Sequence, residues 1–252
     1  DLTNQLRTAS VDKRFFVAYQ LQLDINSGAV IGLEALLRFK NNRNQTVSPN
    51  DFIPILEETG MIIEVGNWVI KKSCQQYQQW RAQKRIPENS FLSINVSPKQ
   101  LLCNTFLCVI KNASDKHKIA PENIVIELTE SVIIDRPEQV KLVLDELTDL
   151  GFKLALDDFG TGYSSLSYLQ MYPFNHIKID KSFIADLAKD SNDAKIIHSI
   201  IALANSLDLE VTAEGVENSH TLGLLKHFGA NYYQGFYHSK PMTAQEIEKF
   251  IE

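Results

Sequence analysis

The sequence predicts an α/β fold, a (β/α)8 barrel of the triosephosphate-isomerase type whose first strand runs antiparallel to the others. Three observations support this prediction: strands and helices alternate in the later part of the chain, a tight hairpin opens it, and its 252 residues match the roughly 250 typical of such barrels. No linker rich in proline or glycine divides the chain, so we expect residues 1–252 to form one domain. A doubly wound open sheet is the second choice.

The N-terminal part predicts a hairpin. Residues Asp1–Ser10 are typical of the end of a polar helix, and because the chain begins without methionine we expect a segment cut from a longer protein. Strands at Phe15–Leu23 and Val30–Phe39 flank a turn at Asp24–Gly28. A turn this short joins antiparallel strands.

Two helices follow the hairpin. Ser48 and Pro49 predict a helix start, with a capping hydroxyl before a proline at the first helical position, and Gly60 predicts its end. A second long helix runs on to about Lys84.

From about residue 91 the chain repeats one pattern: a short apolar strand, a polar residue at its end, then a helical stretch. The strands are 91–94, 124–126, 153–156, 174–177, 209–213 and 231–233, followed by Asn95, Glu127, Asp157 with Asp158, Lys178 with Asp180, Glu214 and Gln234. Helical segments in the later part are Pro137–Leu150, Asp193–Leu207 and Ser219–Phe228. Because the chemistry of such barrels lies where the C-terminal strand ends meet, we expect these polar side chains to converge.

Composition and charge narrow the class of function. Hydrophobic content of 44% and charged content of 22% describe an ordinary soluble globular protein. The net charge of -6 argues against a partner that is a DNA or RNA polymer, but it leaves open a small phosphorylated ligand held through metals. No apolar run could span a bilayer and no signal-peptide pattern begins the chain, so we expect no membrane contact by this segment.

Cysteine and histidine do not predict a metal site of their own. The three cysteines form no C-x-x-C pair, and the six histidines show no metal-ligand spacing. Any metal would therefore be held mainly by oxygen, which favours magnesium, manganese or calcium.

Six polar residues share the same place in the strand and helix pattern: Glu34 on the second hairpin strand, Asn95, Glu127, Asp157, Asp158 and Glu214. Any one of them could be a helix cap or a surface charge. Five carboxylates brought to one place need cations between them, and without histidine or cysteine those are hard divalent ions. Asp157 and Asp158 are close enough to serve two ions, which predicts a two-metal hydrolytic or phosphoryl-transfer site.

Four further residues have two interpretations each. Lys178 could neutralise the carboxylates, or it could orient or help to deprotonate an attacking water. Arg38, on the same strand face as Glu34, could bind a phosphate oxygen or form a structural salt bridge. Gln20 and Gln234 could contact a base edge, although taken alone they favour a surface role.

Two competing interpretations are weaker. Gly160-Thr161-Gly162 suggests a dinucleotide-binding turn, but the third glycine is missing and two aspartates precede it, so we favour the hinge of a mobile loop. A carbohydrate hydrolase also uses carboxylates at barrel strand ends, but it needs only two.

Several motifs are specific in combination: Glu34-Ala35-Leu36-Leu37-Arg38, Ser48-Pro49 through Phe52-Ile53-Pro54, Asn95-Val96-Ser97, Glu127-Leu128-Thr129-Glu130, Asp157-Asp158-Phe159-Gly160-Thr161-Gly162, Lys178-Ile179-Asp180, Ala213-Glu214-Gly215-Val216-Glu217 and Gln234-Gly235-Phe236. With them the sequence resembles the EAL-domain family of bacterial cyclic-di-GMP phosphodiesterases, from Tyr19-Gln20 to Pro241. The resemblance implies a barrel with an antiparallel first strand. It also implies hydrolysis of cyclic di-GMP to linear pGpG with two magnesium or manganese ions, whereas calcium is expected to bind without supporting turnover.

The resemblance also implies a role for each site residue. Glu34, Asn95, Glu127 and Asp157 would hold one metal, and Asp157 and Asp158 the second. Lys178 and Glu214 would help to activate the attacking water, Glu130 would steady the loop after Asp158, and Glu217 would support the site without binding a metal itself. Gln20, Leu36, Arg38 and Gln234 would contact the substrate.

Departures from the family pattern are few and lie on the substrate side. Leu21 stands where the family commonly has proline, Phe39 where it often has tryptophan, and Phe236 where tyrosine is frequent. The alternatives are a receptor that binds cyclic di-GMP without cleaving it, or a regulatory interaction module. The resemblance further implies a homodimer, sensory or cyclase domains in the parent chain, and a cytoplasmic location with or without a membrane anchor in the parent.

Overall fold

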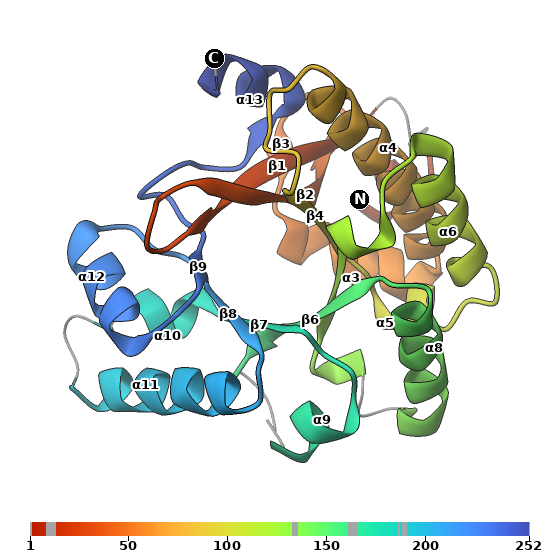
Figure 1. Cartoon of the computed structure of the whole chain (residues 1–252). Helices are drawn as coiled ribbons and strands as arrows, with labels where there is room; N and C mark the ends of the chain where they lie inside the picture. The colour runs from red at the N-terminus through yellow and green to blue at the C-terminus, as the bar shows by residue number, and fades with distance from the viewer. Residues whose placement is uncertain are drawn as a thin grey trace.

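A closed barrel of eight strands forms the centre of the molecule (Figure 1). The computed structural model describes residues 2–8, 14–132, 136–160, 166–185, 187 and 191–251. The barrel strands are β1 (Phe15–Asp24), β2 (Val30–Lys40), β4 (Phe91–Asn95), β5 (Ile124–Thr129), β6 (Lys153–Phe159), β7 (His176–Ile179), β8 (Glu210–Ala213) and β9 (Tyr232–Tyr233). Two short strands, β3 (Thr46–Val47) and β10 (Met242–Thr243), pair with β2 and β1.

The strand pairing confirms the predicted barrel and its antiparallel first strand. β1 pairs antiparallel with both β2 and β9, which closes the sheet and rules out the open-sheet alternative. From β2 through β4 to β9 the neighbouring strands are parallel. The predicted turn joins β1 to β2, where the Gly28 amide donates to the Asp24 carbonyl.

Helices surround this barrel (Figure 1). They are α1 (Leu2–Arg7), α3 (Pro49–Thr59), α4 (Ile62–Ala82), α5 (Pro98–Leu101), α6 (Phe106–His117), the 3-10 helix η1 (Pro121–Asn123), α8 (Pro137–Asp149), α9 (Leu166–Met171), α10 (Lys181–Ala185), α11 (Ser191–Ser206), α12 (Ser219–Phe228) and α13 (Ala244–Phe250). In the part of the chain that the structure describes, no helix is both long and apolar enough to cross a bilayer.

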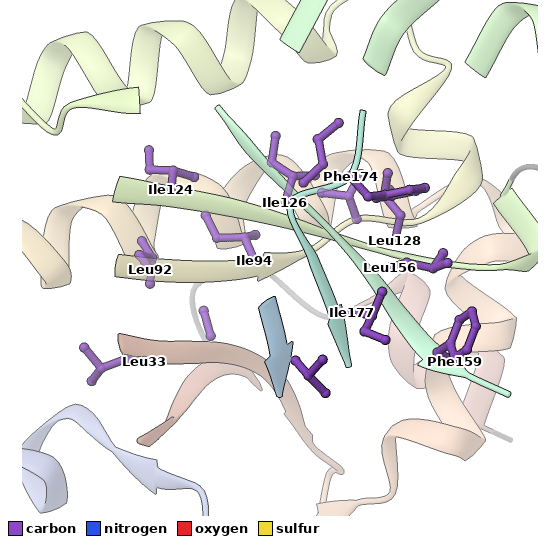
Figure 2. Packing of buried hydrophobic residues seen from close by; sticks show 14 of the residues in the cluster. Leu33, Leu92, Ile94, Ile124, Ile126, Leu128, Leu156, Phe159, Phe174 and Ile177 are labelled. Carbon is purple, nitrogen blue, oxygen red and sulfur yellow. The ribbon is translucent and has the colours of Figure 1, made fainter. Parts of the chain in front are cut away.

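The hydrophobic core lies between the outer face of the barrel and the helices. Because alternate residues of a strand point to opposite faces, Ile124, Ile126 and Leu128 of β5 pack outward into this core, while Glu127 points into the barrel. Figure 2 shows the same apolar packing along the neighbouring strands. The inner face is thereby left for the polar side chains that follow from the sequence.

Two predicted strand boundaries and one predicted helix cap need correction. β7 begins at His176, so Lys178 lies within the strand and not after it, and β6 extends to Phe159, so both aspartates belong to it. Ser48 precedes α3 as predicted, but its side chain makes no capping hydrogen bond. The predicted end of α3 is confirmed, since Gly60 adopts the left-handed conformation with φ of 75°.

Candidate active site

An irregularity at the end of β6 allows two adjacent aspartates to face one site. In a regular strand, neighbours point to opposite faces, so Asp157 and Asp158 could not both point inward. The register with β7 shifts between Leu156 and Phe159, and Asp158 has φ of 53°, which is rare for a residue with a side chain. The Asp158 amide donates to Asp157 Oδ1 at 2.9 Å. The bulge therefore turns the pair toward the barrel mouth.

Lys178 lies at the centre of the carboxylate cluster. Its Nζ atom, on a side chain only 2% exposed, lies near four carboxylates that come from four other strands or strand ends. The distances are 2.7 Å to Glu214 Oε1, 2.8 Å to Glu127 Oε2, 3.3 Å to Asp157 Oδ1 and 3.5 Å to Glu34 Oε1. Four ionised carboxylates around one ammonium would leave the cluster with an excess of negative charge.

The carboxylates form two groups that could each hold a metal ion. Glu34, Glu127 and Asp157 offer oxygens within 4.8 Å of one another, and so do Asp157, Asp158 and Glu214. Asp157 belongs to both groups. The donors are hard oxygens without a sulfur or imidazole ligand, which fits magnesium or manganese, and a shared carboxylate fits two neighbouring ions.

Burial and mutual repulsion shift the proton affinities of the cluster. Burial raises the pKa of Glu214 to about 8, although Lys178 opposes the shift. Burial together with neighbouring Asp157 raises the pKa of Asp158 to about 6. The pKa of Glu127 is also raised, chiefly by burial. The metal-free site therefore holds protons that divalent cations would displace.

Glu34 is the exception within the cluster. Burial opposes its ionisation, but Lys178 and two amide donors outweigh burial and hold its pKa below the ordinary value. Asn95 Nδ2 donates to Glu34 Oε1 at 2.6 Å, and Gln234 Nε2 donates to Glu34 Oε2 at 2.6 Å. Both oxygens of this carboxylate are thus oriented by the protein.

The two glutamines are buried, which corrects the surface role that they favour when taken alone. Gln20 is 7% exposed and Gln234 is 5% exposed. Gln234 Nε2 also donates to Gln20 Oε1 at 2.9 Å, and Gln20 Nε2 donates to the Ser239 carbonyl at 3.0 Å. This chain of amides fixes Glu34 from the β1 and β9 side of the barrel.

Glu130 contacts the backbone that follows the two aspartates. Its Oε1 accepts from the Gly160 amide at 3.0 Å. Gly160 has φ of 101°, and a Cβ atom there would lie 2.8 Å from Phe183, so only glycine fits. The loop predicted to be mobile begins here, and its residues 161–165 lie outside the described residues.

Two hollows open onto the cluster, and Glu34, Leu36 and Arg38 line both of them. One, of about 650 Å³, also contains Gln20, Asp157, Glu214 and Gln234 in its lining. The other, of about 480 Å³, reaches Asn95, Glu127 and Asp158. Arg38 is half-buried, and its Nη1 atom donates to the Leu37 carbonyl at 2.9 Å. Both volumes are in the range of small-molecule sites.

The structure brings together every predicted metal ligand. Glu217 is exposed and lies on the wall of the larger hollow, outside the group of metal ligands. Lys181 and Asn218 line the same hollow, and the sequence interpretation missed both. For Lys181 a signal existed, because it follows Asp180 immediately after a strand end.

Comparison with known proteins gives one family. The model of the EAL domain matches residues 3–241. Cyclic di-GMP phosphodiesterase PdeR of Escherichia coli is 36% identical over 251 residues, which cover 100% of this chain and 37% of PdeR. The bifunctional diguanylate cyclase/cyclic di-GMP phosphodiesterase MucR of Pseudomonas aeruginosa is 35% identical over 246 residues, which cover 98% of this chain and 36% of MucR. The chain thus spans about a third of the length of these relatives.

Solved structures agree with this result. The MucR phosphodiesterase in complex with cyclic di-GMP superimposes with a TM-score of 0.92 at 34% identity, covering 98% of this chain and 99% of that one. The EAL enzyme Bd1971, bound to cAMP and cyclic di-GMP, gives a TM-score of 0.94 at 34% identity, covering 100% of this chain and 68% of that one.

Proposed function

This chain belongs to the EAL domain family, and from that premise we propose that it hydrolyses cyclic di-GMP to linear pGpG with two magnesium or manganese ions. In this reaction water forms a new bond to one phosphorus, the bond from that phosphorus to a ribose 3′ oxygen breaks, and the leaving oxygen takes a proton. The observation that carries the proposal is the pair of carboxylate groups that share Asp157. A receptor that only binds the nucleotide would not need two such groups.

In the proposed site, five residues hold the metals. Glu34, Asn95, Glu127 and Asp157 serve one ion, and Asp157 with Asp158 the other. When bound, the ions supply positive charge that polarises the phosphodiester and lowers the pKa of the attacking water.

Lys178 and Glu214 help to remove a proton from the attacking water. Glu214 Oε1 accepts from Lys178 Nζ at 2.7 Å, and this contact holds the carboxylate beside Asp157 and Asp158, the other members of the second group. Burial raises the pKa of Glu214 in the metal-free protein, so this carboxylate accepts a proton more readily than an exposed glutamate does. Lys178 neutralises part of the negative charge of the neighbouring carboxylates and holds them close to one another.

The two hollows would take the two halves of the dinucleotide. Arg38 and Leu36 line both, so the guanidinium can donate to a phosphate between them while Leu36 packs against a base or ribose. Gln20 and Gln234 contact the substrate in this proposal, although their first task is to orient Glu34. Glu130 steadies the backbone after Asp158, and Glu217 acts from the wall of the hollow.

A turnover assay tests the proposal. Purified protein with magnesium or manganese should convert cyclic di-GMP to pGpG, and Glu34→Ala should abolish the conversion while Glu138→Ala, an exposed carboxylate on α8, should not. Tight binding of cyclic di-GMP without product would indicate a receptor instead. A folded protein that binds no cyclic di-GMP would indicate an interaction module.

The proposal also covers the metal that supports turnover, the oligomeric state and the domains to which this chain is joined. Calcium should bind the carboxylates without supporting turnover, because its larger and more flexible coordination shell positions the reacting groups less strictly. We further propose a homodimer in the cytoplasm that is joined to sensory or cyclase domains. Analytical ultracentrifugation with and without metal would measure the dimer.

A further inference from the structure

A third hollow lies on the outside of the barrel, between α4 and α6. The two helices pack side by side (Figure 1). An open groove of about 590 Å³ runs along them. This α4–α6 groove shares no lining residue with the two hollows at the carboxylate cluster. Its volume is nevertheless close to that of the larger of them, and it falls in the range that encloses a small organic ligand.

Both helices contribute one continuous face to the α4–α6 groove. α4 supplies Trp68, Lys71, Lys72 and Gln75, and α6 supplies Val109, Asn112, Ala113, Lys116 and His117. On each helix these residues follow the spacing i, i+3, i+4 and i+7, which places side chains in one row about 10 Å long. The groove is therefore a property of the helix pair and not of a loop.

The α4–α6 groove is positively charged in an acidic chain. Residues 62–118 contain nine lysines and arginines but three carboxylates, although the whole chain has a net charge of -6. Those three carboxylates, Glu64, Glu88 and Asp115, do not line the groove. Within the described residues, none of the groove lysines forms an ion pair with a carboxylate.

His117, the last residue of α6, also lines the groove. Burial and, after it, neighbouring Lys116 lower the pKa of His117. Three exposed lysines, Lys71, Lys72 and Lys116, line one concave volume that no carboxylate lines. Such a lining favours an anion with several charges, because each lysine can donate to a separate oxygen. Phosphate groups have this property.

The other side chains that line the groove indicate which group accompanies the phosphates in the ligand. Half-buried Trp68 offers an aromatic surface against which a planar base can stack. Gln75 and Asn112 are exposed amides that can donate to and accept from a base edge. We infer that the α4–α6 groove binds a phosphorylated nucleoside, with its base against Trp68 and its phosphates between Lys71, Lys72 and Lys116.

Tryptophan fluorescence measures this binding directly. The chain has two tryptophans, and Trp80 is fully buried with its indole nitrogen donating to Glu248, so a nucleotide that stacks on the protein surface should quench Trp68. The titration uses GTP, GMP, guanosine and pyrophosphate in EDTA, which removes metal-assisted binding at the carboxylate cluster. GTP should bind more tightly than GMP, guanosine should bind weakly, and pyrophosphate should compete without quenching.

A matched pair of variants on one helix provides the control. Lys116→Glu should weaken GTP binding roughly tenfold or more, as expected for losing a charge-assisted contact and adding repulsion. Lys111→Glu makes the same charge change on the exposed side of α6 outside the groove and should change the affinity by less than about twofold. Trp68→Phe should remove the signal while calorimetry still detects binding.

Three results would overturn the inference. Quenching that Lys116→Glu leaves unchanged would place the nucleotide elsewhere, and equal weakening by Lys111→Glu would reduce the effect to overall charge. Polyglutamate that binds more tightly than GTP would make the groove a docking surface for an acidic protein. Because no readout here involves turnover, failure of this inference leaves the proposed hydrolysis untouched, and Lys116→Glu should still hydrolyse cyclic di-GMP.

Discussion

Lys178 Nζ lies 2.7 Å from Glu214 Oε1, and this ion pair is the centre of a cluster in which four carboxylates share one ammonium group. Burial alone would lower the pKa of Lys178, but the surrounding carboxylates raise it well above its ordinary value. The lysine is therefore a fixed positive charge that the metal-free site needs for stability.

Replacing this lysine should destabilise the metal-free protein strongly. Lys178→Met leaves several buried carboxylates without their cation, and the expected loss is roughly 3–5 kcal/mol in the free energy of unfolding. Lys141→Met, which removes an exposed i,i+4 pair with Asp145, should cost at most about 1 kcal/mol. Urea unfolding in EDTA measures both variants. Added manganese should recover part of the loss in Lys178→Met, and equal stability of the two variants would contradict the structural role.

The shared aspartate should control metal binding. Asp157→Asn keeps the side-chain volume and the acceptor for the Asp158 amide, but it weakens both carboxylate groups at once. Saturating manganese should raise the stability of the unsubstituted protein by about 2.7 kcal/mol when its concentration is a hundred times the dissociation constant. In Asp157→Asn we expect less than half of this gain, measured by thermal unfolding.

Asp145→Asn is the control for that experiment. Asp145 is an exposed carboxylate on α8 that contacts Lys141 and lies outside both metal groups. The full gain should be retained in this variant. A full gain in Asp157→Asn as well would refute the assignment of Asp157 to both metals.

The carboxylate cluster was predictable because its members occupy one repeated position in the chain. Polar residues at consecutive strand ends must converge once the barrel closes, so Glu34, Asn95 and Glu127 could be placed without coordinates. The bulge at Asp157 and Asp158 could not, since it depends on the register between β6 and β7. Only this register explains how two neighbours can face the same site.

The hydrogen bonds of the two buried glutamines also could not be predicted from the sequence. The bond from Gln234 to Glu34 joins residues 200 positions apart, and a glutamine carries no local signal for burial. The pattern likewise could not choose between the two roles of Lys178, because its four contacts form only when five parts of the chain meet. Contacts of this kind depend on barrel closure and not on local spacing.

The contact between Glu130 and Gly160 should affect turnover more than stability. Glu130→Leu removes the acceptor for the Gly160 amide just beyond the two aspartates, so the loop backbone loses its anchor. Because Gly160 follows the two aspartates so closely, losing this anchor should displace Asp158 and lower turnover at least tenfold, or about 1.4 kcal/mol in activation free energy. Glu130→Gln keeps one carbonyl acceptor and should retain most of the activity. Equal losses in both variants would show that the charge, not the hydrogen bond, is what matters.

His176 should make the protein less stable in mild acid. This side chain lies at the other end of β7 from the carboxylates, near Phe91 and Tyr232, and its Nε2 atom is 3.2 Å from Glu210 Oε2. Burial lowers its pKa below the ordinary 6.5, although Glu210 opposes the shift. As the pH falls through 6.5, the unfolded chain binds the proton before the folded protein does, so stability is lost from that point downward.

The phenylalanine variant isolates this contribution from the other titrating groups. His176→Phe keeps an aromatic ring against Phe91 and Tyr232 and has no proton to bind, while Glu210 still accepts from the Tyr232 hydroxyl at 2.7 Å. Urea unfolding between pH 7.5 and 5 should show a steeper loss of stability in the unsubstituted protein than in His176→Phe. Parallel curves would mean that His176 titrates alike in both states and would contradict the prediction. A steeper loss in the variant would mean that the pKa of His176 is raised in the folded protein, as expected if Glu210 holds the histidine in its charged form.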